Sequence, residues 1–231
     1  MSRTQISTIK QAWIFVVPIA LYFCYVVSDP FRCKLCDQKI PVSSLTVQQK
    51  LNIHKVAAKI DGIVLRPDEE FSFNGRVGPR TVEKGYFQAP SYIGTGSYST
   101  PGGGICVISS ALYQDALLAG LTVTERVAHN RTMLTVAPGL DATVWYGGAD
   151  LKFKNTSNQP VQIHCAVDDE VVTVSLHGQT KPVSAPILTT RELPSSRDQI
   201  AVEVLLTKNS NTKVISRDVY TLHSPGRTTR S

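Results

Sequence analysis

The chain has 231 residues, of which 42% are hydrophobic and 18% are charged, and its formal net charge is +6. This balance is typical of a globular protein with a core and excludes a disordered chain or one embedded throughout in a membrane. The basic residues are scattered without a dense run, so we expect no nucleic-acid partner, and an anionic cell surface or wall polymer fits the charge better.

An apolar run near the amino terminus is the first recognisable element. Residues 12–27, AWIFVVPIALYFCYVV, carry no charge, and Arg3 and Lys10 precede them. The length lies between a signal-peptide core and a full membrane span. Cleavage after Ser28 is an alternative, but the small-x-small pattern is poor. We therefore expect residues 1–28 to form an uncleaved single-pass membrane anchor, with the C-terminal domain outside the cytoplasm.

Residues 29–43 are expected to form a linker that contains a C-x-x-C pair, Cys33 and Cys36. A zinc site would need a second pair or nearby histidines at matched spacing, and neither is present. The pair is therefore interpreted as a local disulfide or as two inert thiols. No metal and no cofactor are expected.

The domain that follows, residues 44–180, is predicted to mix helices and strands. Apolar residues at helical spacing between 53 and 60 predict an amphipathic helix, ended by Gly62. Residues 71–73 alternate as a half-buried strand, and the Gly- and Tyr-rich segment 91–100 is expected to form an exposed hairpin or flap.

The segment from 105 to 119 is apolar on most sides, which predicts a buried central helix. Alternation over 121–129 then predicts a strand with Val127 and His129 facing inward and Arg126 outward. A hairpin is expected over 161–176, with Cys165 as a core thiol. Residues 181–231 are read as a linker and a short β extension. The predicted fold class is α+β, an antiparallel sheet packed on a central Cys-bearing helix.

Cys106 opens the predicted central helix directly after Gly102, Gly103 and Gly104. The first turn of a helix favours negative charge and so lowers a thiol pKa. Glycines let a substrate approach the backbone, whose N–H groups can stabilise an oxyanion. Ser109 and Ser110, three and four residues on, lie on the same side of the helix and are candidates to line a substrate pocket. The alternative is a tight turn with Cys106 as a small packing residue.

A thiolate enzyme also needs an imidazole as base and acid, and His129 on the next strand is the candidate. A carboxylate on a neighbouring strand would orient the ring, and Asp141 or Asp150 could supply it. Each aspartate sits beside turn glycines, so capping a turn is the alternative role for both. The order Cys, His, Asp resembles that of transglutaminase-like and papain-like enzymes.

Several motifs occur in one order between residues 52 and 178: FSFN at 71–74, VGPRT at 77–81, KGY at 84–86, GGGIC and SSALY within 102–113, LLAGL at 117–121, PGLDATV at 138–144 and DLKFKN at 150–155. Together they resemble the VanW family. The resemblance implies a bacterial cell-envelope protein, commonly membrane-anchored and named for an accessory gene of vancomycin-resistance clusters, with no settled activity. Three family features differ here: Val107 replaces Gln, Ala111 replaces Thr, and HNRT at 129–132 replaces HSRP.

Two main functions remain open at this stage. The first is an anchored envelope protein that binds or remodels peptidoglycan or its precursors. The second is a Cys106–His129 amidase or transpeptidase acting on wall peptides. A non-catalytic partner that docks through the flap 91–100 is a weaker third.

Overall fold

The computed structural model describes residues 29–93, 96–181 and 184–222. The predicted membrane anchor over residues 1–28 lies outside the described residues. Within the described ranges, every helix is too short or too polar to cross a membrane.

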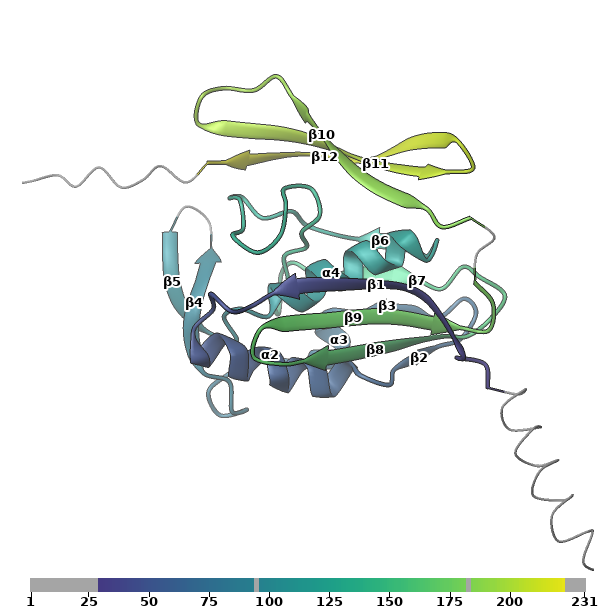
Figure 1. Cartoon of the computed structure of the whole chain (residues 1–231). Helices are drawn as coiled ribbons and strands as arrows, with labels where there is room; N and C mark the ends of the chain where they lie inside the picture. The colour runs from purple at the N-terminus through teal and green to yellow at the C-terminus, as the bar shows by residue number, and fades with distance from the viewer. Residues whose placement is uncertain (1–28, 94–95, 182–183, 223–231) are drawn as a thin grey trace, which may run out of the picture.

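The main sheet has four antiparallel strands in the order β1-β9-β8-β2 (Figure 1). The predicted hairpin forms its centre, with Ile163 opposite Leu176 and Cys165 opposite Val174. These side chains are buried, because alternate residues of both strands face the helices. The strands are β1 (Cys33–Pro41), β2 (Val64–Leu65), β8 (Val161–Val167) and β9 (Val171–Gly178).

The predicted linker over 29–43 is wrong over most of its length, since β1 pairs along the whole of β9. Charged residues at 34, 37 and 39 hide the alternation expected of a strand, and a bulge between Lys34 and Cys36 shifts the register. As an edge strand, β1 tolerates these charges. The C-x-x-C pair therefore lies within the fold, and both thiols are free.

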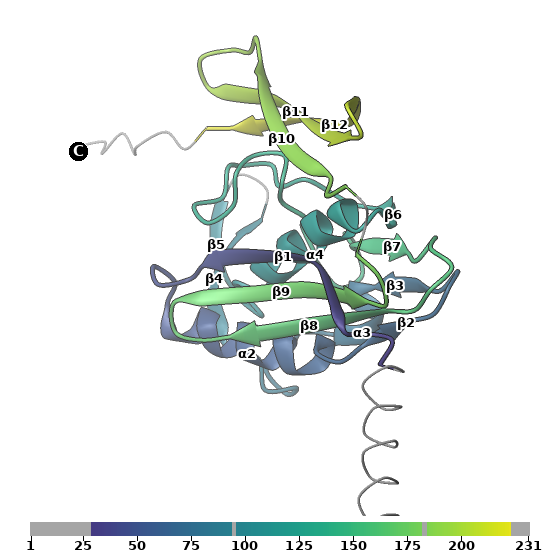
Figure 2. The ribbon, with the colours of Figure 1, turned by 45° about the vertical axis from the view of Figure 1, so that its right-hand side comes forward.

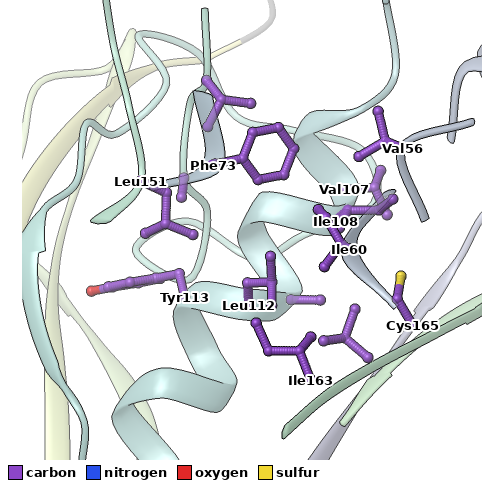
Figure 3. Close-up of a cluster of buried hydrophobic side chains, with 14 of the residues drawn as sticks. Val56, Ile60, Phe73, Val107, Ile108, Leu112, Tyr113, Leu151, Ile163 and Cys165 are labelled. Atoms are coloured by element: carbon purple, nitrogen blue, oxygen red, sulfur yellow. The ribbon is translucent and has the colours of Figure 1, made fainter. Parts of the chain in front are cut away.

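Two helices pack on the main sheet, α4 against β1 and β9, and α2 against β8. Helix α2 (Val47–Ile60) starts at Thr46, which forms a capping box with Gln49, and it buries the predicted stripe of Ile53, Val56, Ala57 and Ile60. Helix α4 (Cys106–Leu118) is buried on nearly all sides, as predicted. Figure 3 shows its Ile108 and Leu112 among core side chains from α2, β8 and the loops.

Shorter strands and a short helix connect the main sheet with α2 and α4. One of these strands corresponds to the strand predicted over 121–129. It ends early, as β6 (Thr122–Glu125), and a bulge beyond Val123 shifts its pairing with β7. Because a one-residue shift exchanges the two faces, Arg126 turns inward and Val127 is 43% exposed, the reverse of the prediction. The remaining elements here are β3 (Glu70–Ser72), α3 (Phe73–Val77), the predicted hairpin β4 (Gln88–Ile93) and β5 (Gly96–Pro101), and β7 (Lys152–Lys154).

The carboxy-terminal part forms a separate three-stranded antiparallel sheet, β10-β11-β12. The predicted final hairpin is present as β11 (Gln199–Lys208) and β12 (Asn211–Thr221), but the expected linker before it contains β10 (Ile187–Leu193). Figures 1 and 2 show this sheet at one end of the molecule, next to α4 and β6. The α+β class is thus confirmed, with a carboxy-terminal sheet that has one strand more than the predicted hairpin.

Candidate active site

Cys106 lies on the wall of a cavity of about 970 Å³. The walls come from the start of α2, the loop 79–81, the hairpin β4–β5, and the loops 127–135 and 143–149. The thiol is half-buried, and the first turn of α4 presents it to this space. The cavity is therefore large enough to admit a peptide-sized ligand to the sulfur.

The three glycines before Cys106 line the same cavity and are required by close packing. Gly102 and Gly104 have φ values of +83° and +98°, which other residues rarely adopt. A side chain on Gly103 would come within 2.3 Å of the carbonyl oxygen of Ala89 in β4. The loop thus fits tightly between β4 and α2 and fixes where α4 begins.

The imidazole of His129 lies beside the thiol of Cys106. Burial by itself would raise the pKa of Cys106, but a hydrogen bond with His129 and the positive charge of that ring outweigh burial and lower the pKa. Burial likewise opposes charge on His129, yet its bonds to Asp141 and Cys106 raise its pKa to about 10. The pair therefore favours thiolate and imidazolium, the reactive state of a cysteine nucleophile.

Asp141 is the carboxylate that holds His129. Its Oδ2 accepts from the ring Nδ1 of His129 at 2.6 Å and from the main-chain N of the same residue at 2.7 Å. The side chain is 1% exposed. Burial opposes its ionisation, but the bond and charge of His129, together with the bond from Tyr220 and the charge of Arg126, outweigh burial and lower the pKa of Asp141. With Nδ1 bound to the carboxylate, Nε2 is the ring nitrogen left for the thiol.

Asp150, the other predicted acid, lies in a different network. Its carboxylate accepts from Ser72 Oγ at 2.6 Å and from the main-chain N of Asn74 at 2.8 Å, at the start of α3. It also accepts from the main-chain N of Leu151. Asp150 thus stabilises the start of a short helix, whereas the alternative role expected from the sequence was to cap a turn.

The two predicted substrate-binding serines are fully buried and do not line the cavity. Ser109 Oγ donates to the carbonyl oxygen of Ala142 at 2.7 Å, and Ser110 Oγ accepts from the N of Ala142 at 3.0 Å. The structure thus uses both hydroxyls to join α4 to the segment that carries Asp141. They fix the acid relative to Cys106 instead of contacting a ligand.

Arg80 is a cavity residue that the sequence analysis did not single out. Its charge is among those that lower the pKa of Cys106. The guanidinium donates to Asn74 Oδ1 at 2.6 Å and lies 5.9 Å from the centre of the Tyr146 ring. No carboxylate forms an ion pair with it in the described part of the chain. The VGPRT motif contained it, but its spacing from Cys106 gave no signal.

The cavity also has an aromatic rim. Trp145 is 61% exposed and Tyr146 is 49% exposed, although both are large apolar residues. The Trp145 ring packs on Gly148, where a Cβ would lie 3.2 Å from it, so the turn fixes the ring in place. Exposed aromatic side chains beside a cavity are typical of a binding surface.

Comparison with known proteins agrees with the motifs. The family model described as VanW like protein matches residues 48–177, more than half of the chain. The chain belongs to the VanW family. It is 46% identical over 112 residues to "Uncharacterized protein YoaR" of Bacillus subtilis, a match that covers 48% of the chain and 37% of the relative.

A second VanW relative is the "Vancomycin B-type resistance protein VanW" of Enterococcus faecalis. It is 27% identical over 157 residues, which cover 65% of the chain and 57% of that protein. The chain thus spans less than two thirds of the length of both relatives. No solved structure matches it.

Proposed function

We propose that this VanW protein is a cysteine acyl-transfer enzyme that cleaves or exchanges an amide bond in a peptide. The observation that carries the proposal is the thiol of Cys106, half-buried in an open cavity with the His129–Asp141 pair beside it. Tight packing alone would place a thiol among aliphatic groups and raise its pKa, as it does for Cys165.

The chemistry follows from these groups. The Cys106 thiolate attacks the amide carbonyl carbon, forming a C–S bond and an oxyanion. As the oxyanion collapses, the C–N bond breaks and His129 gives its proton to the leaving amine. Water, or the amine of a second peptide, then attacks the thioester and gives a proton to His129. The C–S bond breaks, releasing an acid or a new amide and restoring the thiolate.

The start of α4 offers donors for the oxyanion. The main-chain N–H groups of Ile105 and Val107 bond to the carbonyls of Gly102 and Gly104. Those of Gly104 and Cys106 have no bonded acceptor among the described residues. Cys106 is the first residue of α4 and Gly104 lies just before its N-cap, so the helix dipole adds to the effect of both groups.

The substrate we propose is a peptide of the bacterial cell envelope, in peptidoglycan or its precursors. Support comes from family membership, from a relative named as a vancomycin resistance protein, and from the net charge of +6, which favours an anionic wall. Residues 12–27 would anchor the chain with this domain outside the cytoplasm. Fusing a reporter that is active only outside the cytoplasm after residue 222 tests that location, and an inactive fusion would contradict it.

The test of the enzyme uses the full chain with purified peptidoglycan fragments. We expect mass spectrometry to detect cleaved or exchanged stem peptides, and expect Cys106→Ser and His129→Ala to reduce the products to background. Cys165→Ser is the matched control, because that thiol is buried in the sheet core. Equal product formation by Cys106→Ser would overturn the proposal.

A second candidate, binding to the wall without catalysis, is favoured by the exposed rim of Trp145 and Tyr146. Aromatic faces bind sugar rings without a reactive residue. Retention on insoluble peptidoglycan should then fall for Trp145→Ala and survive Cys106→Ser. Phe87→Ala is the control, since Phe87 is 49% exposed but lies outside the cavity. If Trp145→Ala is retained on peptidoglycan as well as the unmodified chain, the aromatic rim is not the binding surface.

A further inference from the structure

The hydrogen bonds behind His129 continue into the carboxy-terminal sheet. Tyr220 of β12 donates its hydroxyl proton to Asp141 Oδ1 at 2.5 Å and accepts from the main-chain N of Gly139 at 2.7 Å. The Tyr220 side chain is 1% exposed. It also accepts from Arg126 Nη2 at 3.3 Å, so two donors set the direction of the hydroxyl and Asp141 is its acceptor.

A second residue of β12 reaches the same acid through Arg126. Arg126 donates from Nε to the main-chain O of Asp141 at 2.8 Å and from Nη2 to its Oδ1 at 3.2 Å. Asp218 holds the other arm of the guanidinium, Nη1, at 2.6 Å. Because Asp218 and Tyr220 are two residues apart, they lie on one face of β12.

Close packing seats this sheet on the loop that carries Asp141. Gly139 has a φ of +90°, and a Cβ there would come within 2.7 Å of Val204 and 3.2 Å of Val202, both on β11. Those two valines are buried, at 0% and 2% exposure. The loop 138–141 is thus packed directly against β11.

We propose that Tyr220 is a positioning residue, which fixes the carboxylate of Asp141 and thereby the ring of His129. The sheet β10–β12, beyond the region that the family model matches, is then part of the active site. This inference rests on the proposed function, because it assigns Tyr220 a role in charging Cys106.

The physical reason is the division of the two carboxylate oxygens. Tyr220 and Arg126 bind Oδ1, while both bonds from His129 go to Oδ2. With Oδ1 held, the carboxylate cannot rotate away from the ring. Loss of the hydroxyl leaves a looser carboxylate, a weaker bond to Nδ1, and a thiolate with less support.

The test is alkylation of the full chain with iodoacetamide between pH 5 and 9, followed by mass mapping of Cys106. We expect Tyr220→Phe to move the midpoint of labelling up by about one pH unit, which lowers the rate about tenfold at pH values well below that midpoint. Asp218→Asn should give a smaller shift in the same direction. An unchanged midpoint would overturn the inference. So would a downward shift, which would mean that losing the hydroxyl only strengthens the negative charge of Asp141 and does not loosen its position.

The matched control is Tyr86→Phe. Tyr86 is also buried, its hydroxyl has no hydrogen-bond partner among the described residues, and it lies outside the cavity lining. Cys106 in Tyr86→Phe should label as fast as in the unmodified chain. Thermal melting of both variants shows whether each is still folded under the labelling conditions.

Failure of the inference can be separated from failure of the proposed function. If His129→Ala slows labelling and Tyr220→Phe does not, only the inference fails. If Cys106 in the unmodified chain labels no faster than in denaturant, the proposed function fails. The imidazole proton resonances of His129 then still report whether Tyr220→Phe loosens the Asp141 bond, and unchanged resonances would overturn the inference.

Discussion

Each end of α4 has a cysteine with an aspartate nearby, but the two ends differ in ionisation. The groups at the start are charged, and those near the end are neutral. At the start, Cys106 stands beside His129, and the pair favours the ionised forms. Near the end, Cys36 of β1 donates to the main-chain O of Asp115 at 3.4 Å. Burial, reinforced by the charge of Asp115, raises the pKa of Cys36 far above its usual range.

Asp115, like Cys36, is held in its neutral form by burial. It is fully buried, and its carboxyl oxygens have no hydrogen-bonded nitrogen or oxygen partner among the described residues. Burial raises the pKa of this carboxyl to about 8. The partner, more than the motif, decides reactivity: the C-x-x-C thiol is held neutral, and the isolated cysteine beside an imidazole is charged.

The largest effect we predict is on stability, at the neutral end of α4. Folded Asp115 keeps its proton up to about pH 8, whereas the unfolded chain releases it near 3.8. The folded state therefore binds more protons between these values, and stability falls as pH rises, by up to about 1.4 kcal/mol per pH unit.

Asp115→Asn removes this titration. The free energy of unfolding in urea should be similar for both chains at pH 4 and higher for the variant by several kcal/mol at pH 8. His129 also loses stabilising charge as pH rises, but it does so in both chains. Parallel pH profiles for the two would mean that Asp115 is ionised in the fold.

The next effect concerns thiol reactivity at the charged end. His129→Ala leaves the half-buried Cys106 without its imidazole, so its pKa should return to the ordinary value or above. Iodoacetamide labelling of Cys106 at pH 7 should then fall about thirtyfold or more. Cys36 in the same sample is the internal control and should label slowly in both chains. If iodoacetamide labels Cys106 and Cys36 of the unmodified chain at equal rates, the two ends of α4 do not differ in thiol reactivity.

The sequence predicted the parts of this site that depend on local pattern. The glycine loop, the buried helix and the order of Cys106, His129 and Asp141 were all visible, because each rests on spacing along the chain. The choice between Asp141 and Asp150 was not, since both sit beside turn glycines and only the fold separates them. The bulge in β6 also reversed Arg126 and Val127, an effect that alternation cannot foresee.

Long-range pairing accounts for the other misses. The strand β1 was masked by its charges, and its partner residues in β9 lie at least 130 positions away in the sequence. Tyr220 is 79 residues from Asp141, so no motif could join them. Ser109 and Ser110 were predicted to line a substrate pocket, but the sequence could not show that the segment around Ala142 covers them.

A smaller effect separates the two candidate acids. Asp141→Asn takes the charged partner from His129, and we expect the pH midpoint of Cys106 labelling to rise by about one unit. Asp150→Asn should leave that midpoint in place and instead lower the free energy of unfolding by about 1–2 kcal/mol, because it weakens the bonds that start α3. Urea unfolding and labelling, measured on both variants, test whether the labelling shift belongs to Asp141→Asn and the loss of stability to Asp150→Asn. A shift of the midpoint by Asp150→Asn would place that acid in the triad's network.

The smallest predicted effect belongs to Arg80, whose charge acts on the thiol after that of His129. Arg80→Gln should slow neutral iodoacetamide at Cys106 about twofold, and anionic iodoacetate by more, because the cavity loses a positive charge. The ratio of the two reagents is the measurement, and added salt should shrink the difference between chains. Arg76→Gln is the matched control, since that arginine pairs with Glu69 outside the cavity. If both substitutions change the ratio equally, the net charge of the protein is responsible, and the cavity offers no specific anchor for an anionic group.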